Sequence, residues 1–275
     1  MSKKLNIEKQ DLFNLYVTQG FSLQEIATKF NVSHGAILYW MKKFQINRRD
    51  LSSACKGVQL GTSKKRIYSL NEDFFKFPSS DMFWVLGFIA ADGCIERSRT
   101  WSVCQKKIEP IIKIKKHIGY TGPIEERKIF RLRVNSNKHV DDLNKFGIIK
   151  RKSLILNFPV IPNEYFWDFV RGYFDGDGSI FKRNRCVNGK MYRPVYVNFV
   201  GSHSFINSLA KKISENLNIP KQTLILDGKN KKVSKIVFRN RKYILKMMTE
   251  IYNGSHNDNR LNRKYRRFKN WLKEL

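Results

Sequence analysis

Two copies of one motif decide the fold, namely Phe83-Trp-Val-Leu-Gly-Phe-Ile-Ala-Ala-Asp-Gly-Cys-Ile95 and Asp168-Phe-Val-Arg-Gly-Tyr-Phe-Asp-Gly-Asp-Gly-Ser-Ile180. Aligned on their last Asp-Gly pairs, the copies place Asp92 on Asp177, 85 positions apart. Each apolar run predicts a helix that ends at its Asp-Gly pair, because glycine readily adopts the left-handed conformation that ends many helices. The chain therefore contains an internal repeat built around two similar helices.

Small side chains recur at helical spacing within each copy. Four residues separate the members of each pair, Gly87 and Ala91 in the first copy and Gly172 and Gly176 in the second. Residues four apart share one face of a helix, so each pair forms a smooth stripe. Such stripes allow two helix backbones to approach closely. If the stripes pack on each other, Asp92 and Asp177 lie side by side at the end of the seam.

Two neighbouring carboxylates repel each other, and burial strengthens the repulsion unless a cation lies between them. The pairing of Asp92 with Asp177 therefore predicts a divalent metal site with these two side chains as ligands. We expect Mg²⁺ (or Mn²⁺), since Mg²⁺ accepts few protein ligands and retains bound water. The alternative is a pair of buried helix ends whose acids carry no chemistry.

The two motifs together resemble those of the LAGLIDADG homing endonucleases, in the single-chain form with two tandem motifs. The second copy is similar to the family pattern, whereas the first has Ala90 where the family usually has an acidic residue and the second copy has Asp175. The resemblance covers roughly residues 81–275. It implies an α+β fold of two pseudo-twofold αββαββα units with saddle-shaped antiparallel sheets. It also implies that the last acid of each motif binds metal and that the earlier position is structural.

The same resemblance implies further residues near the metal. Gln105, at the end of a predicted strand, stands where the family often has a polar residue that orients water, and Ser202 is the candidate in the matching stretch of the second unit. The family also has a lysine near each site. Lys152 is the candidate in the first unit, with Lys150 next, and Lys264 is the candidate in the second.

The composition is strongly basic for a chain of 275 residues. Lys and Arg number 53 against 23 Asp and Glu, which gives a formal net charge of +30 and a pI near 10.1. Such an excess indicates a polyanionic partner, and double-stranded DNA is the first candidate. A membrane is a poor rival, because the longest apolar run, residues 82–91, is half as long as a spanning helix. We expect a monomer without a membrane partner.

Neither the cysteines nor the histidines indicate a second metal site or a disulfide framework. The four cysteines form no Cys-x-x-Cys pair, and the five histidines are scattered. The N-terminus lacks the apolar core of a signal peptide. A reducing cytoplasm, with the protein associated with nucleoid DNA, is the expected location.

Residues 1–47 show a separate pattern of short helices. Helical spacing over residues 6–18 is followed by a Ser-x-x-Glu capping box at residues 22–25 and a second cap at Ser33. This order resembles a helix-turn-helix module of the resolvase and transposase kind. The side chains expected to contact DNA are Ser33, His34, Tyr39, Lys42 and Lys43. The alternative is a three-helix interaction domain.

Residues 48–80 carry seven Lys or Arg, three acids and no sustained period, which is typical of a solvated basic linker. The first repeat unit is expected over residues 81–164 and the second over residues 165–275. Tethered between two DNA-binding modules, the linker would also contact phosphates.

After each Asp-Gly pair the apolar period changes from helical to two, which predicts strands. We expect a hairpin at 93–105, a helix at 108–118 and a strand at 124–134, then strands at 180–182 and 195–200 around a basic loop at 183–193, a helix at 205–217, a hairpin at 224–238 and further helices. An antiparallel sheet covered on one side leaves its other face open. The basic side chains expected to contact DNA there are Arg127, Arg131, Arg133, Lys182, Arg183, Arg185 and Arg193.

Together these features predict a site-specific, metal-dependent double-strand DNA endonuclease of the homing type. By resemblance it should leave staggered ends and recognise a long asymmetric site, and intron homing is the associated process. The alternative is a non-cleaving protein on the same scaffold, either a transcription regulator or an intron-splicing maturase. Retention of both Asp92 and Asp177 favours the nuclease.

Overall fold

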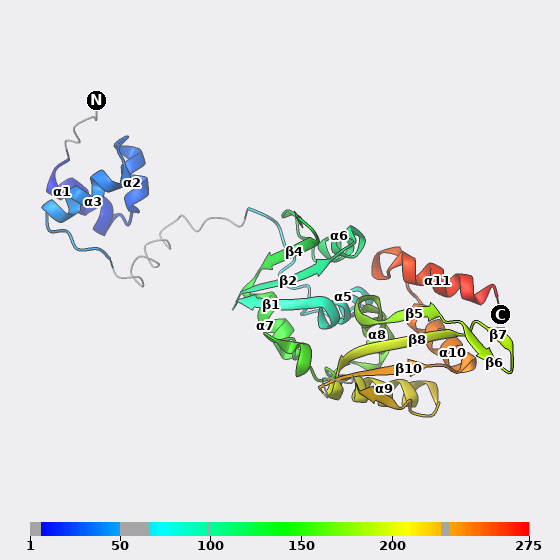
Figure 1. Cartoon of the computed structure of the whole chain (residues 1–275). Helices are drawn as coiled ribbons and strands as arrows, with labels where there is room; N and C mark the ends of the chain where they lie inside the picture. Colours follow the sequence, from blue (N-terminus) through cyan, green and yellow to red (C-terminus); the bar gives the residue numbers. More distant parts are fainter. Residues whose placement is uncertain (1–6, 50–66, 98, 227–231, 275) are drawn as a thin grey trace. The chain divides into compact units, whose positions relative to one another are not determined.

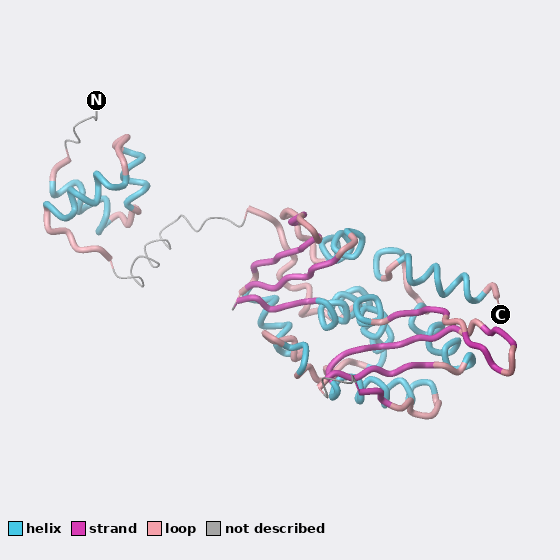
Figure 2. Tube along the Cα trace, viewed as in Figure 1, coloured by secondary structure: helices cyan, strands magenta, loops and turns pink. Residues whose placement is uncertain are grey.

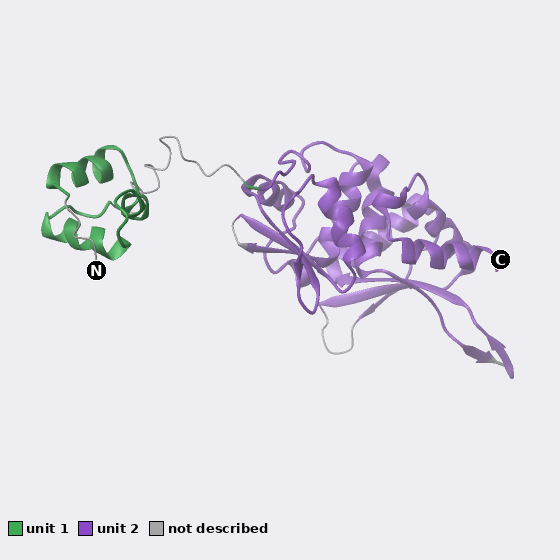
Figure 3. Cartoon of the chain, turned by 90° about the horizontal axis from the view of Figure 1, so that it is seen from above, with its two compact units in different colours: residues 1–67 green, residues 68–275 purple. Residues whose placement is uncertain are grey.

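The computed structural model describes residues 7–49, 67–97, 99–226 and 232–274. The chain divides into two compact units, residues 1–67 and residues 68–275 (Figure 3). Across the described residues, no helix combines the length and the apolar content needed to cross a membrane. The tip of the hairpin predicted at 224–238, residues 227–231, lies outside the described residues.

The first unit is built from short helices, as predicted (Figure 1). Helix α1 (Lys9–Phe13) continues as the π-helical turn η1 (Asn14–Thr18), and α2 (Leu23–Lys29) and α3 (His34–Lys43) follow. The capping box forms, because the Ser22 hydroxyl accepts from the Glu25 N–H while the Glu25 carboxylate accepts from the Ser22 N–H. Leu12, Ile26 and Ile37 are fully buried at the centre of this unit.

The predicted linker begins inside the first unit. The guanidinium of Arg49 stacks on the ring of Tyr16, 4.4 Å from its centroid, and donates to the carbonyls of Gly20 (3.0 Å) and Phe21 (2.8 Å). These contacts hold the chain after α3 against the helices. The central part of the predicted linker, residues 50–66, lies outside the described residues.

The end of the predicted linker belongs to the second unit. Residues from Tyr68 onward cluster with it, and the side chain of Phe75 is 3% exposed within its core. The N–H of Asn71 also donates to the carbonyl of Ile118 at 2.9 Å. The prediction of a linker up to residue 80 is therefore wrong for residues 68–79, because one buried aromatic and backbone pairing anchor them.

The second unit contains two similar halves (Figure 2). The first half comprises α5 (Ser80–Asp92), β1 (Gly93–Arg97), β2 (Thr100–Gln105), α6 (Ile108–His117), β3 (Glu125–Glu126), β4 (Phe130–Asn135) and α7 (Asn137–Lys145). The second half comprises α8 (Phe166–Asp177), β5 (Ser179–Lys182), β8 (Val195–Ser202), α9 (His203–Leu217), β9 (Leu224–Leu226), β10 (Val233–Phe238), α10 (Arg241–Tyr252) and α11 (Asn262–Leu272). Short 3₁₀ turns, η2 (Lys152–Leu154), η3 (Asn163–Tyr165) and η4 (Asn257–Asn259), occur in the connections.

The two halves have equivalent antiparallel sheets. The strand order is β1-β2-β4-β3 in the first and β5-β8-β10-β9 in the second. The basic loop predicted at 183–193 contains a further hairpin, β6 (Arg185–Val187) with β7 (Lys190–Tyr192), that the strand pattern did not predict. The predicted αββαββα repeat is confirmed, since each half places one motif helix before a sheet of the same order.

Each sheet buries one face and leaves the other open. Helices lie on one side of the sheets, as Figure 3 shows. The inward side chains alternate along the strands and are almost fully buried: Trp101, Val103, Leu132 and Val134 in the first sheet, and Val197, Phe199, Ile236 and Phe238 in the second. Within the described residues of this unit, no helix covers the opposite faces.

Helices α5 and α8 pack on each other along the predicted stripes. A Cβ atom added to Gly87 would lie 2.2 Å from the carbonyl oxygen of Phe169, and one added to Gly172 would lie 2.0 Å from that of Trp84. A Cβ on Gly176 would lie 2.3 Å from the Cβ of Ala91. No side chain fits at these glycines without separating the helices.

The predicted role of the Asp-Gly glycines is wrong in its detail. Gly93 and Gly178 follow the two helices with φ of −82° and −86°, which is extended backbone and not the left-handed region. The reason for glycine is instead the close approach of the preceding turn. A Cβ on Gly93 would lie 2.4 Å from Cγ2 of Ile89, and one on Gly178 would lie 2.2 Å from Cδ2 of Phe174.

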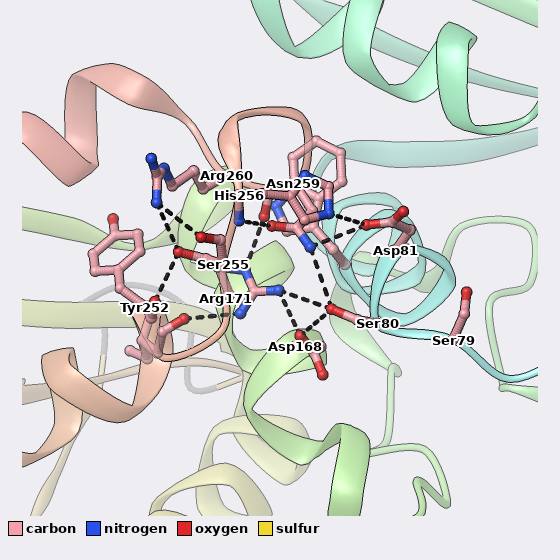
Figure 4. A network of polar contacts seen from close by, with 12 residues as sticks. Ser79, Ser80, Asp81, Asp168, Arg171, Tyr252, Ser255, His256, Asn259 and Arg260 are labelled. Atoms are coloured by element: carbon pink, nitrogen blue, oxygen red, sulfur yellow. Dashed lines mark hydrogen bonds and ion pairs between the residues drawn. The ribbon is translucent and has the colours of Figure 1, made fainter.

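A buried polar network ties the C-terminal segment to the beginnings of α5 and α8 (Figure 4). Its centre is Arg171, whose side chain is fully buried. The guanidinium donates to the carbonyls of Ile251 (3.0 Å) and Asn259 (2.8 Å), to the Ser80 hydroxyl (3.3 Å) and to the Asp168 carboxylate. One side chain thus connects four separate segments.

Replacing Arg171 with Met should lower the free energy of unfolding by about 3 kcal/mol or more, because the change leaves the Asp168 carboxylate and two carbonyls without their donor. Urea-induced unfolding followed by circular dichroism measures the difference. The matched control is Arg267→Met, at an exposed position of α11, for which less than about 0.5 kcal/mol is expected. Equal effects of the two changes would show that the network does not stabilise the fold.

Candidate active site at the ends of the paired helices

The structure brings the two motif aspartates together. Asp92 is the last residue of α5, Asp177 is the last residue of α8, and the two helices are in contact along their length. The Asp92 carboxylate reaches across the seam, since its Oδ2 lies 3.1 Å from the place a Cβ on Gly176 would occupy. Asp177 reaches solvent at the mouth of the seam, yet the surrounding protein and the Asp92 carboxylate raise its pKa to about 6.

Gln105 holds one of the two acids. It ends β2, and its side-chain amide donates to Oδ2 of Asp92 at 2.6 Å. Burial raises the pKa of Asp92, while this hydrogen bond and the nearby Lys264 and Lys152 act in the opposite direction. Gln105 therefore lies beside the predicted metal ligand, where it fixes the orientation of the carboxylate.

The two predicted lysines occupy equivalent positions in the halves of the site. The ammonium of Lys152 donates to the carbonyl of Ala91 at 3.2 Å, and that of Lys264 donates to the carbonyl of Gly176 at 3.4 Å. Ala91 and Gly176 each precede a motif aspartate, so the repeat relates the two contacts. Lys264 also donates to the carbonyls of Phe174, Asp175 and Gly178. Lys150, the other candidate in the first unit, is exposed.

The lysines offset much of the charge of the aspartates. Both are buried, and burial lowers the pKa of Lys152 and lowers that of Lys264 to about 8. A carboxylate at the C-terminal end of a helix meets the negative end of the helix dipole, which disfavours its charge, whereas a cation there is stabilised. Lys152 and Lys264 therefore offset part of the repulsion between Asp92 and Asp177, while the raised pKa of Asp177 shows that part of it remains.

The donor set nevertheless fits a divalent cation. Mg²⁺ in proteins is commonly held by one or two carboxylates together with water and substrate phosphates. Within the described ranges, no group of three or more His, Cys, Asp or Glu side chains could enclose a metal ion. An ion at Asp92 and Asp177 would therefore take its remaining ligands from water and from a phosphate-bearing substrate.

The prediction of Ser202 as the counterpart of Gln105 is wrong. Cys94 pairs with Ser102 in the first sheet and Ser179 pairs with Asn198 in the second, so the position equivalent to Gln105 is Gly201. The Ser202 hydroxyl is buried, donates to the carbonyl of Leu156 and accepts from the Phe205 N–H as the N-cap of α9.

Tyr173 fills the space above Gly201. A Cβ on Gly201 would lie 2.3 Å from the Tyr173 hydroxyl, which donates to the carbonyl of Val200 at 2.8 Å. Tyr173 aligns with Phe88 of the first motif. The hydroxyl that Tyr173 has and Phe88 lacks was therefore the sequence signal for this difference between the two halves. The site is therefore asymmetric: Asp92 has a side-chain amide partner, whereas the matching strand beside Asp177 carries glycine.

Asp175 is buried away from the open sheet face. Its Oδ2 accepts from Nε1 of Trp84 at 3.0 Å and from the N–H of Leu261 at 2.9 Å, and burial raises its pKa. These contacts join α5, α8 and the start of α11. They agree with the structural role that the resemblance implies for this position, which Ala90 occupies in the first motif.

On the first sheet, Arg131 and Arg133 share the open face of β4. Arg133 pairs with Glu96 and Glu125, at 3.2 Å each, and Arg131 lies 4.0 Å from Glu125. Arg127 was predicted on the same face but lies in the turn after β3, because that strand ends at residue 126. Its side chain is exposed.

The other predicted DNA-binding residues are mostly exposed. Arg183, Arg185 and Arg193 surround the β6–β7 hairpin, and Lys182 pairs with Glu274 of the chain end. In the first unit, the exposed side chains of α3 include His34, Tyr39, Lys42 and Lys43. The Ser33 hydroxyl accepts from the N–H of Ala36 at 3.2 Å and so caps α3.

Solved structures share the fold of the second unit at low sequence identity. Meganuclease I-SmaMI bound to uncleaveable DNA is 14% identical with a TM-score of 0.53, and the match covers 70% of this chain and 88% of that chain. LAGLIDADG homing endonuclease I-GzeII in complex with its DNA target is 15% identical with a TM-score of 0.51, over 70% and 88% of the two chains. The chain has the LAGLIDADG fold.

A third structure, I-SmaMI bound to uncleaved DNA target in the presence of calcium ions, is 13% identical with a TM-score of 0.51, over 72% of this chain and 90% of that chain. Residues 2–69 match the family of helix-turn-helix proteins described as YlxM / p13 like. The predicted helix-turn-helix is thereby confirmed as a structural class. No curated protein sequence matches the chain.

Replacing Asp177 with Asn should raise the thermal midpoint of the metal-free protein at pH 7 to 8. Because the pKa of Asp177 is raised to about 6, ionisation above that pH disfavours the folded state. The gain should shrink as the pH falls through about 6, since the native carboxyl then becomes protonated too. Differential scanning calorimetry between pH 5 and 8 measures the difference. Asp141→Asn, at an exposed position of α7, is the control and should show no such trend. A gain in thermal midpoint that grows toward low pH would contradict the link between the ionisation of Asp177 and the stability of the fold.

Proposed function

We propose that the chain is a site-specific, metal-dependent endonuclease of the homing type that hydrolyses both strands of a long asymmetric DNA site. The observation that carries the proposal is the paired centre of two aspartates and two lysines at the seam between two open sheets. DNA-bound structures of the same fold support it. The two halves differ in sequence, which suits an asymmetric site and a monomeric protein.

The proposed chemistry divides between a bound ion and the protein. When bound, Mg²⁺ or Mn²⁺ supplies water activation and stabilises charge on the phosphate. Asp92 and Asp177 hold the ion at the seam, and Gln105 keeps the Asp92 carboxylate in place. The ammonium groups of Lys152 and Lys264 lie at the C-terminal ends of α5 and α8, where they would stabilise negative charge that develops on the cut phosphates.

The helix-turn-helix provides a second attachment to the same DNA. Once one module is bound, the tether raises the local concentration of the other, so that overall affinity exceeds that of either module alone. The excess of 53 Lys and Arg over 23 acids favours such binding throughout the chain. We place the protein in the cytoplasm, associated with nucleoid DNA, with intron homing as the process it serves.

Asp92→Asn and Asp177→Asn should each lower the rate of plasmid linearisation by more than about a hundredfold, because even an outer partner of a metal ligand contributes on the order of 10- to 100-fold. The substrate is a plasmid that joins the two DNA flanks of the gene, with Mg²⁺ in the buffer. Binding of the same DNA, measured by mobility shift, should change less than about threefold. Asp141→Asn is the exposed control and should cleave normally.

The outcomes distinguish the nuclease from the alternative, a non-cleaving DNA-binding protein on the same scaffold. Specific binding by the native protein without cleavage in Mg²⁺ or Mn²⁺ would favour a non-cleaving regulator or maturase. If the Asp92→Asn or Asp177→Asn protein folded but lost DNA binding as well as cleavage, the assignment of these two residues to catalysis alone would be contradicted. Retention of both acids in an open seam is the observation that favours the nuclease over this alternative.

A further inference from the structure

The open faces of the two sheets differ in chemistry. The first sheet presents polar and charged side chains, among them Glu96, Glu125, Arg131, Arg133 and Asn135. The second sheet presents a larger apolar share, namely Phe181, Tyr196, Val200, Ile225 and Val237, with Ser179, Asn198 and Lys235 among them. Both faces belong to equivalent strands, so the contrast is a property of the sequence and not of the fold.

A groove occupies the open face of the second sheet, with a volume of about 620 Å³. Phe181 and Tyr196 stand opposite each other on β5 and β8, and their rings stack at 5.6 Å between centroids and 20° between planes. Asn198 and Val237 lie beside them in the same lining. The groove therefore has an ordered apolar floor.

The rim of this groove is positively charged. Arg183, Arg185 and Arg239 contribute to its lining together with Lys235, and no acidic side chain of the described residues does so. A polyanion with an apolar edge is complementary to such a surface, whereas an ordinary apolar peptide would leave the four cations without partners. Duplex DNA is the occupant that matches both features.

Within the major groove, the apolar group on a base edge is the C5-methyl of thymine. Aromatic and aliphatic side chains contact that methyl, and an asparagine amide can pair with adenine. Asn198 lies in the same groove, and its side-chain oxygen accepts from the Ser179 hydroxyl at 2.5 Å, which orients the amide. One face thus offers contacts for both bases of an A·T pair.

We propose that the sheet β5-β8-β10-β9 reads a thymine-rich half-site through its methyl groups, with Phe181, Tyr196 and Val237 as the apolar contacts and Asn198 for the paired adenines. The inference rests on the proposed function, because it takes the open face of the sheet as the DNA face. The first sheet, in which glutamates flank Arg131 and Arg133, suits G·C pairs instead, since Arg pairs with guanine and Glu accepts from cytosine.

The first experiment selects the target without cleavage. The full-length protein, in Ca²⁺, is used to enrich duplexes from a random library, and the bound sequences are read. One half of the enriched site should be rich in A·T pairs, and Arg133→Ala should relax the preference in the other half only. An enriched site with no A·T bias in either half would overturn the proposal, and a library from which no site emerges would count against specific DNA binding itself.

The second experiment removes methyl groups from the enriched site. Replacing thymine by uracil in the A·T-rich half should weaken binding about fourfold for each contacted methyl, and the same replacement in the other half should have no effect. Fluorescence anisotropy with both duplexes measures the ratio of affinities. Equal affinity for the thymine and uracil duplexes in the native protein would overturn the methyl contact.

The matched variants are Phe181→Ala and Tyr196→Ala, both at open-face positions. In each variant, the ratio of affinities for the thymine and uracil duplexes should fall toward one. The Arg133→Ala protein should keep the ratio of the native protein. A variant that merely loosens the sheet would weaken both duplexes equally and leave the ratio unchanged. Unchanged ratios in both aromatic variants would therefore contradict the assigned contacts.

Discussion

The close approach of α5 and α8 is the constraint on which the rest of the second unit depends. Gly87 and Gly172 leave no room for a side chain, so the two helix backbones lie in contact. This contact fixes where both helices end and therefore where Asp92 and Asp177 meet. It also fixes the position of the two sheets, since each follows directly from its helix. One steric requirement thus determines the site and the surface around it.

Charge compensation at the seam comes from distant parts of the chain. Lys152 lies between the two halves and Lys264 lies in the last helix, yet both donate to the ends of the motif helices. Their burial would be unfavourable without the carbonyls and carboxylates they contact. The two lysines thus offset part of the charge of the aspartates, and the pKa of about 6 at Asp177 reflects the repulsion that remains. A cation bound between Asp92 and Asp177 would lower this remaining repulsion.

Residue patterns predicted the elements that repeat, because the stripe of small residues in each motif and the aspartate that follows it are local signals. The equivalence of Lys152 and Lys264 followed only from the family resemblance, since their spacing from the motifs differs. Ser202 was misplaced because the β6–β7 hairpin lengthens the second half and alters the count between motif and strand. The extended backbone at Gly93 was missed because side-chain crowding by Ile89, a three-dimensional property, selects glycine there.

Helix α11 has a consequence for the timing of synthesis. It spans Asn262–Leu272 of a chain of 275 residues, and it supplies Lys264 to the seam while Leu261 just before it binds Asp175. Because chains fold as they leave the ribosome from the N-terminus onward, the helices of the first unit and the first half of the second unit can form before α11. The seam stays incomplete until α11 has emerged. A chain that stops before α11 would therefore lack both Lys264 at the seam and the backbone N–H of Leu261 that Asp175 accepts from.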